Sequence, residues 1–470
     1  MQVLTCLTIF ILSTAAIYSL MFMLSPQTAS DSAQPVGIRG TFLDFTGDPF
    51  FEGEQAVRLV SDGLLVIQDG YIQGFGDYGQ MASSYDNLAV QAYPDRLIIP
   101  GMVDTHIHYP QTGMMAAYGE QLLEWLDRYT FPTERAFQDK TYAQEVAELF
   151  LDELLKNGTT TALVFAAVFP ESVDAFFEAA ARRNLRMIAG KVMMDCNAPD
   201  YLCDTAESSY LESRELIQKW HGRGRLLYAV TPRFAGTSSR QQLDMAGKLL
   251  REFPDVYLQT HLAENQDEVA WMRELFPDSQ DYLDIYDQSG LVKSRSVFAH
   301  CVHLSEREFS RLSEADGAIA FCPTSNLFLG SGLFNLARAK SAASPIKVGL
   351  GTDVGAGTSF SLLQTTNEAY KVAQLQGQKL SPMQALFLAT LGGARALCLG
   401  DKIGSFDPGK EADFVVLDDR ATPLLALRNG GEKSATLEAI CDRIFSLVIM
   451  GDDRAIDTTY IMGRPVHQRA

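Results

Sequence analysis

The sequence predicts an α/β fold in which a (β/α)8 barrel of the TIM type is joined to a small β-sandwich domain. Three observations predict it. Short apolar runs alternate with helix-like segments between about residues 97 and 353, strand-like runs lie on both sides of that region, and histidine or aspartate stands where several apolar runs end. A chain of 470 residues has room for one large domain and a smaller companion.

The first 36 residues are expected to form an apolar extension. Residues 3–24 carry no charge, and no lysine or arginine precedes Arg39. That length suits a membrane-spanning helix or a long signal sequence, but the basic region that begins a signal sequence is missing. Three alternatives stay open: an anchor or export signal, an unstructured extension, or translation assigned upstream of the true start. The last two are favoured, so the expected location is the cytoplasm, with membrane anchoring or export through residues 3–24 as the alternative.

Strand-like runs follow at residues 40–45 and 63–72, accompanied by turn residues such as Asp69-Gly70. After the barrel region, strands return at 412–417 and 458–462, and the tail 460–466 is typical of a hairpin that turns at Gly463. We therefore expect residues 37–98 and 404–470 to build the small β-sandwich together, from both ends of the chain.

Residues 99–403 are expected to form the barrel, because a parallel barrel alternates short buried strands with covering helices. Helix-like segments lie at 120–129, 141–156, 172–183, 238–252, 267–275 and 380–399. The eight apolar runs that predict its strands are 98–106, 160–165, 187–193, 226–231, 256–261, 296–301, 318–322 and 347–353.

Five potential metal ligands end these predicted strands, and active sites of such barrels lie at the carboxyl ends of the strands. His106 and His108 stand two apart, which puts both side chains on one face of the first strand. His261 ends the fifth strand, His300 the sixth and Asp353 the eighth. Imidazoles with one carboxylate suit zinc or iron, and such a metal lowers the pKa of a bound water towards about 7. The sequence therefore predicts a metal-dependent hydrolase.

Glu264 is the candidate general acid and base, because it stands three residues beyond His261 and can face the same cavity. A solvated loop carboxylate is the alternative. Lys191 on the third strand raises the possibility of a second metal bridged by a lysine carbamate. The fourth strand, where that bridge usually lies, ends in Thr231-Pro232-Arg233 without a lysine, so one metal is favoured. His221, His303 and His467 receive no role.

Composition excludes other classes of protein. The net charge of −19 argues against a nucleic-acid partner, since such binding relies on an excess of lysine and arginine. The seven cysteines never form a Cys-x-x-Cys pair, which indicates reduced thiols and argues against both a disulfide framework and a thiolate zinc site. The fold that carries a catalytic zinc on Pro-Cys-x-x-Cys is excluded for the same reason. Cys301 and Cys322 each end an apolar run and are expected to be small core residues.

Several motifs taken together resemble the amidohydrolase superfamily and, within it, the guanine deaminase family. The resemblance runs from about residue 37 to 466. It is carried by PGMVDTHIH (100–108), HYPQ (108–111), LLEWL (122–126), YTFP (129–132), TPRF (231–234), CPTSNL (322–327) and GLGTD (349–353), with His261 and His300.

The resemblance implies a homodimeric enzyme of purine catabolism that deaminates guanine by hydrolysis to xanthine and ammonia. It implies one zinc ion per subunit, held by the five ligands above, although the ligand types also suit iron. It assigns catalysis to Glu264 and Asp353. It assigns substrate binding to Gln111, Arg233, Phe234, His261 and Glu264. An amide, a guanidinium and an aromatic wall suit a flat neutral purine.

Each of the three new assignments has a structural alternative: a turn residue for Gln111, a surface ion pair for Arg233 and core packing for Phe234. Two alternatives concern the whole protein. It could be another deaminase, or a chlorohydrolase, of the amidohydrolase superfamily that acts on a different heterocycle, such as a triazine, a pterin or an adenosine-like substrate. It could also be an inactive scaffold on the same barrel, although such proteins lose ligands that this chain keeps.

Overall fold

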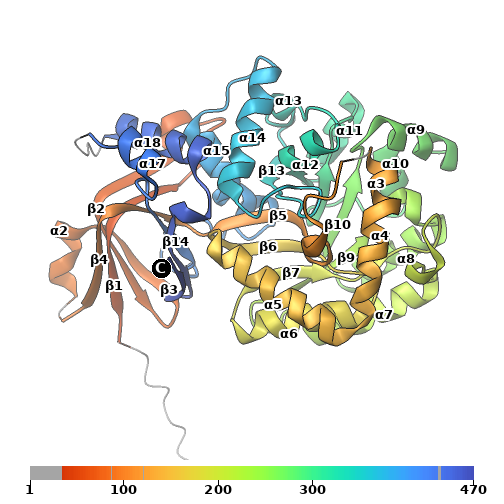
Figure 1. Ribbon diagram of the computed structural model, residues 1–470, viewed down its shortest axis with the longest axis horizontal. Coiled ribbons are helices and arrows are strands. Elements are labelled where there is room, and N and C mark those ends of the chain that lie inside the picture. The colour runs from red at the N-terminus through yellow and green to blue at the C-terminus, as the bar shows by residue number, and fades with distance from the viewer. Residues whose placement is uncertain (1–33, 86, 120, 432–435, 470) are drawn as a thin grey trace, which may run out of the picture.

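Two β-sheets organise the protein (Figure 1). A computed structural model describes residues 34–469, apart from residues 86, 120 and 432–435. The larger sheet is parallel, and β13 lies against β5, so the sheet closes into the predicted barrel. β7 and β8 share one position of the ring, because both pair with β9. The strands are β5 (Met102–His108), β6 (Thr159–Phe165), β7 (Arg186–Gly190), β8 (Val192–Met193), β9 (Leu227–Pro232), β10 (Tyr257–Leu262), β11 (Ser296–His300), β12 (Ala318–Phe321) and β13 (Lys347–Leu350).

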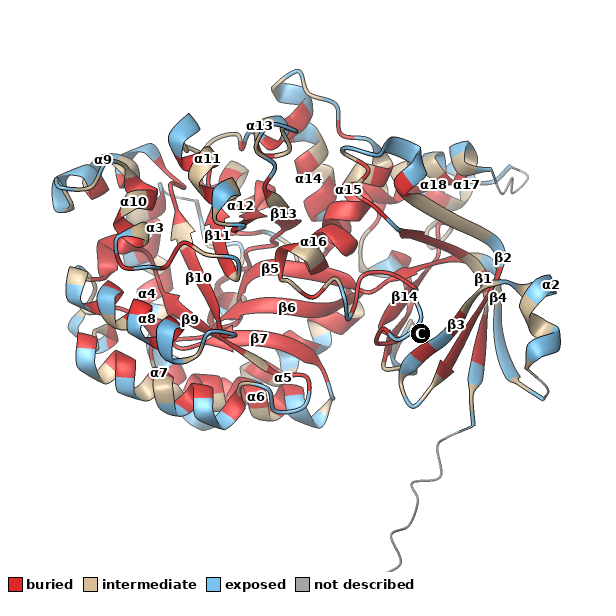
Figure 2. Ribbon diagram, turned by 180° about the vertical axis from the view of Figure 1, so that it is seen from behind, coloured by how far each residue is buried: buried red, intermediate tan, exposed pale blue. Residues whose placement is uncertain are grey.

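Helices cover the outside of the barrel, whose strands are buried (Figure 2). Helix α5 shows why: Ala143, Ala147 and Leu151 repeat at helical spacing on its buried side, and the Asp139 carboxylate caps its first turn. The covering helices are α5 (Lys140–Lys156), α6 (Pro170–Arg182), α7 (Ala206–Trp220), α8 (Arg240–Glu252), α9 (Gln266–Leu275), α10 (Tyr282–Asp287), α11 (Glu306–Glu314), α12 (Pro323–Phe328), α13 (Leu336–Ala339), α14 (Leu362–Leu375), α15 (Pro382–Ala389) and α16 (Leu391–Ala396).

The smaller sheet combines strands from both ends of the chain, as predicted. Phe42, Phe406 and Tyr460 belong to a separate apolar cluster on this sheet, so it has a core of its own. Its last two strands form the predicted hairpin, which turns at Met462 and Gly463, where the φ of +71° suits glycine. The strand order is β16 (Arg464–Gln468), β15 (Ile456–Ile461), β14 (Phe414–Leu417), β4 (Ala89–Pro100), β1 (Val36–Phe45), β2 (Val57–Gln68) and β3 (Tyr71–Asp77).

Several predicted strands were wrong in their bounds. The run 98–106 spans two strands of different sheets: Ile98 and Ile99 pair with β14 in the small sheet, and β5 of the barrel begins at Met102. An apolar run does not reveal that its two halves belong to different sheets. The run 63–72 is likewise divided by the turn at Asp69-Gly70. The eighth barrel strand ends at Leu350, so Asp353 lies three residues beyond it.

The predicted helix 120–129 is a more irregular segment. It comprises α3 (Leu122–Trp125), a π-helical turn η4 (Leu126–Thr130) and α4 (Phe131–Glu134). The predicted helix 380–399 breaks at Thr390 between α15 and α16. Helices α17 (Pro423–Arg428) and α18 (Leu437–Met450), which lie in the region where only strands were expected, were not predicted, and α18 packs on α14 and α15 of the barrel.

No helix within the described ranges is both long and apolar enough to cross a membrane. The apolar segment 3–24 lies outside those ranges.

Candidate active site

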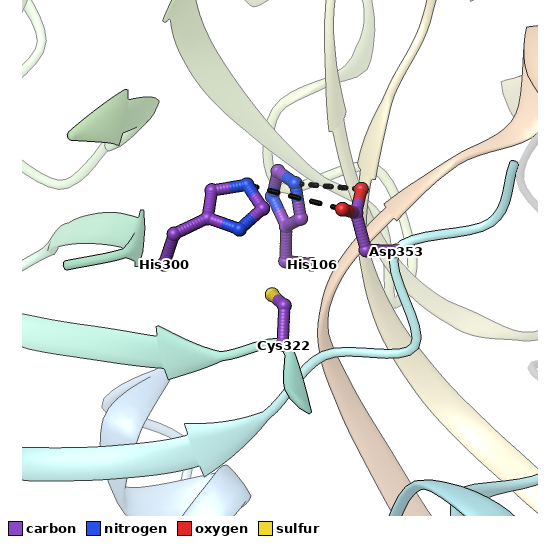
Figure 3. A group of neighbouring side chains, drawn as sticks. All are labelled: His106, His300, Cys322 and Asp353. Atoms are coloured by element: carbon purple, nitrogen blue, oxygen red, sulfur yellow. Dashed lines mark ion pairs between the residues drawn. The ribbon is translucent and has the colours of Figure 1, made fainter. Parts of the chain in front are cut away.

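The five predicted ligands converge at the carboxyl ends of the barrel strands. His106 and His108 lie on β5, His261 on β10, and His300 is the last residue of β11. Asp353 joins them from the loop that follows β13. Figure 3 shows His106, His300 and the Asp353 carboxylate pointing toward one another.

The distances between the ligand atoms suit a single metal ion. The Nε2 atom of His108 lies 3.2 Å from the Nε2 atoms of both His106 and His261. The Oδ1 atom of Asp353 lies 3.1 Å from His106 Nε2 and 3.4 Å from His108 Nε2. Atoms that each lie about 2.1 Å from one ion are about 3.0–3.4 Å apart, so the spacing fits. His300 Nε2 is more distant, at 3.8 Å from Asp353 Oδ2.

Neighbouring groups orient two of the imidazoles. The Nδ1 atom of His261 lies 2.7 Å from the Arg233 carbonyl oxygen, and that of His300 lies 2.8 Å from Asn326 Oδ1. Each acceptor fixes the proton on Nδ1 and leaves Nε2 free to coordinate. His300 Nε2 is buried and has no hydrogen-bond partner among the described residues. A buried orphan nitrogen of this kind fits the donor set of a metal site.

The charge states also suit metal binding, which requires neutral imidazoles and ionised carboxylates. Burial, followed by the charges of neighbouring histidines, holds the pKa of His108 and of His261 well below the usual value. Burial by itself raises the pKa of Asp353, but the charge and hydrogen bond of His106 outweigh it and lower the pKa to about 2. At neutral pH His108 and His261 are therefore neutral, and Asp353 is ionised.

Cys322 lies in the same cluster (Figure 3), with its sulfur within 4.8 Å of ligand atoms of His106, His300 and Asp353. Burial and the nearby Asp353 charge raise the pKa of this thiol well above its usual value. Its Sγ donates a 3.4 Å hydrogen bond to the Ala320 carbonyl. A protonated thiol is a poor ligand, so the position fits a small core residue.

Glu264 lies beside the ligands, with Oε2 3.4 Å from His300 Nε2, and Oε1 accepts a 3.3 Å hydrogen bond from Ser331 Oγ. Burial, followed by the charges of Asp353 and Glu268, raises its pKa well above the usual value. A carboxyl group in this state can hold a proton at neutral pH and deliver it. This geometry does not match the solvated loop carboxylate of the alternative interpretation.

The backbone around these residues is strained. Ala263, His300 and Asp353 adopt positive φ angles of 49°, 70° and 52°. Such conformations cost about 1–3 kcal/mol each for residues other than glycine and cluster at functional sites. The strain therefore marks the same three strand ends that carry Glu264 and three of the predicted ligands, His261, His300 and Asp353.

The three predicted substrate-binding residues line one cavity together with the ligands. Gln111, Arg233 and Phe234 face it with Glu264, and Trp125 provides part of its apolar wall. Its lining combines a few polar groups with apolar and aromatic side chains, as small-molecule sites do. The Arg233 side chain is buried, so its ion pair is not a surface pair.

Two carboxylates and one aromatic ring near the site were not predicted: Glu134, Glu268 and Trp125. Glu134 accepts hydrogen bonds from Gln111 and Arg233. The Oε2 atom of Glu268 accepts hydrogen bonds from the backbone N–H groups of Glu264, at 2.9 Å, and of Asn265, at 3.1 Å. These bonds fix the loop that carries Glu264. The capping box at Asn265 and Glu268 was a readable signal for that role. Trp125 stands in a motif of the resemblance but carried no assignment.

Lys191 is not part of the cluster. Its buried ammonium group contacts Asp204 Oδ2 at 2.5 Å and Glu212 Oε2 at 3.2 Å. Because these two carboxylates pair with the ammonium group, Lys191 does not fit the carbamate bridge of a second metal. Among the described residues, both groups of histidine, cysteine and acidic side chains that could hold a metal include His106. The arrangement agrees with one metal.

The comparisons with known proteins agree with this geometry. The Amidohydrolase family matches residues 97–466. Guanine deaminase from Escherichia coli is 57% identical over 435 residues, which cover 92% of this chain and 98% of that protein. Guanine deaminase from Mus musculus is 36% identical over 382 residues, which cover 78% of this chain and 82% of that protein.

Solved structures give the same result. The structure of the E. coli guanine deaminase superposes with a TM-score of 0.89 and 56% identity, covering 93% of this chain and all (100%) of that one. A guanine deaminase structure from C. acetobutylicum with bound guanine in its active site superposes with a TM-score of 0.83 and 29% identity, covering 92% of this chain and 100% of that one. The predicted resemblance is thereby confirmed, and the chain belongs to the amidohydrolase family, within its guanine deaminase branch.

Proposed function

We propose that the protein deaminates guanine by hydrolysis, producing xanthine and ammonia in purine catabolism. One observation carries the proposal: the cavity that contains the metal-ligand cluster also contains an amide, Gln111, and a guanidinium, Arg233. These groups complement the amide-like edge of guanine, and Phe234 offers a flat apolar wall for the ring. The names of relatives with up to 57% identity support the same substrate.

The proposed metal is a single zinc ion held by His106, His108, His261, His300 and Asp353. The donor set of nitrogens with one carboxylate supports zinc and also accommodates iron. A divalent ion bound there acts as a Lewis acid and makes water a better nucleophile at neutral pH.

The side chains of the chain perform the remaining steps of the proposed reaction. Arg233 and Gln111 hold the purine by its polar edge while Phe234 supports the ring. Water adds to the carbon that carries the exocyclic amine, and Asp353 accepts a proton from it. Glu264 donates a proton to the adjacent ring nitrogen, and proton transfer to the amine lets it leave as ammonia. The raised pKa of Glu264 supports its role as the acid.

Steady-state assays with guanine, adenine, cytosine and a triazine test this proposal. We expect guanine to have the highest kcat/KM of the four, because the other compounds do not offer the same polar edge to Gln111 and Arg233. A protein that turns over another heterocycle in preference to guanine, or none of the four, would overturn it.

We further propose that the enzyme is a cytoplasmic homodimer. The family resemblance supports the dimer, and the unpaired cysteines support a reducing compartment: all six cysteines in the described ranges are free thiols. Light scattering of the purified protein tests the first proposal. Fractionation of cells that express the native gene tests the second, and recovery in the membrane pellet would contradict it.

A further inference from the structure

Glu134, the last residue of α4, is a buried carboxylate that touches two of the residues lining the cavity. The Arg233 Nη1 atom donates to both of its oxygens, at 3.0 Å and 2.8 Å. The Gln111 Nε2 atom donates to its Oε1 atom at 3.1 Å. Gln111 is held at its other end as well, because its Oε1 atom accepts the Gly355 N–H at 3.2 Å. One carboxylate thus fixes the rotamers of both polar side chains.

The ion pair also neutralises the charge that Arg233 brings to the cavity. Arg233 and Glu134 pair with each other and with no other charged side chain among the described residues. Both side chains are at most 3% exposed, so water screens neither charge. The pair is therefore neutral as a unit, and the guanidinium still has Nε and Nη2, which form no hydrogen bond within the described ranges, available as donors.

The segment that carries Glu134 also supplies a wall of the cavity. Leu122, Trp125 and Leu126 line it from α3 and the start of the π-helical turn, and α4 continues directly to Glu134. A π-turn of this kind is frequent at functional sites. One continuous segment, residues 122–134, therefore places both the apolar wall and the carboxylate.

We propose that Glu134 is a positioning residue that determines substrate preference. Its carboxylate holds Gln111 and Arg233 in the orientation that binds the purine, and it cancels the Arg233 charge so that the site favours a neutral ring over an anionic one. This inference rests on the proposed function of Gln111 and Arg233 in substrate binding. It concerns a residue that acts through those two and does not itself touch the reacting atoms.

The substitution Glu134→Gln keeps the size of the side chain and removes its charge. We expect the KM for guanine to rise by about tenfold or more, because hydrogen bonds to a charged partner are lost. We expect kcat to stay within about threefold, since the lost interaction serves ground and transition states alike. Xanthine loses a ring proton more readily than guanine, so the ratio of its inhibition constant to the KM for guanine should fall.

Glu411→Gln is the matched control. Glu411 is also a buried carboxylate that accepts from two arginines, Arg186 at 2.6 Å and Arg225 at 2.7 Å, but it lies where the small sheet meets the barrel. We expect it to lower the melting temperature without changing KM. Metal content of each variant should match that of the unaltered enzyme. If Glu134→Gln does not fold, Glu134→Asp keeps the charge on a shorter side chain that cannot reach both partners, and its KM should still rise.

A double-mutant cycle with Arg233→Gln isolates the route of the effect. Because Glu134 acts through Arg233 as well as through Gln111, the loss in the double variant should be smaller than the product of the two single losses. Multiplied losses in the double variant, or an unchanged KM in both Glu134→Gln and Glu134→Asp, would overturn the inference. The unaltered enzyme is assayed on guanine alongside. Should it prefer another heterocycle, the proposed function fails, and the effect of Glu134 is then read on the KM for that compound.

Discussion

At the residue scale, the sequence pattern predicted the candidate ligands, which the fold brings together, but it missed the groups that hold Gln111 and Arg233. His106, His108, His261 and His300 were predictable because each stands at or near the end of an apolar run, and parallel strands bring their carboxyl ends together. Glu134 offers no such signal. It is one acidic residue in an irregular helical segment, and only the fold reveals that it is fully buried against Arg233.

Glu264→Gln tests the proposed proton carrier. The variant should keep its metal, because the amide leaves all five ligands in place. Its kcat should fall by at least about two orders of magnitude, as expected when a general acid and base is removed. Steady-state kinetics together with metal analysis of the same sample measure both, and near-normal turnover would refute the role.

His261→Ala should behave differently. It removes one of the nitrogens that lie 3.2 Å apart in the cluster, so the metal content and the activity should be lost together. A variant that keeps a full equivalent of metal would show that His261 is not a ligand. The comparison with Glu264→Gln separates loss of the metal from loss of proton transfer.

At the element scale, the order of strands and helices was predictable, but the sheet to which each strand belongs was not. The run 98–106 reads as one strand because both halves are apolar, whereas Ile98 pairs in the small sheet and His106 stands in the barrel. The junction of the two sheets contains a buried cluster in which Arg186 and Arg225 contact Glu411. Arg225 also contacts Asp413, so two arginines and two carboxylates join the elements there.

Glu411→Gln should lower the free energy of unfolding at neutral pH by about 3 kcal/mol, since it leaves buried arginines partly unpaired. Burial by itself raises the pKa of Glu411, but the hydrogen bond of Arg186 and the charge of Arg225 outweigh it and hold the pKa below its ordinary 4.5. Because the pKa of Glu411 is lower in the folded protein, its ionised carboxylate stabilises the fold at pH values above 4.5. This stabilisation is lost as the pH falls through the pKa of the folded state. The difference between the two proteins in urea denaturation should therefore shrink in acid. A difference independent of pH would contradict this.

At the scale of the whole molecule, the cluster unites distant parts of the chain. Its members come from β5, β10, β11 and the loop after β13. The barrel and the sheet built from both chain ends were predicted, because the alternating pattern of strands and helices changes on either side of the barrel region. The domain boundaries at residues 98 and 404 stay a prediction. α18 lies beyond the second boundary yet packs on barrel helices α14 and α15.

Removal of the metal should destabilise the whole barrel, because an ion bound to four separate strand ends stabilises the folded state alone. We expect a chelator to lower the melting temperature of the enzyme and added zinc to restore it. In His261→Ala the chelator should have little further effect. If the chelator leaves the melting temperature of the enzyme unchanged, the result would contradict a metal site formed by these strand ends.

Metal content measured alongside guanine turnover on one preparation tests the central claim most directly. The account predicts about one equivalent of zinc or iron per chain, and turnover of guanine that disappears on chelation and returns with the metal. Less than about half an equivalent, with no activity on reconstitution, would contradict a metal-dependent deaminase. Full turnover by metal-free protein would contradict it as well.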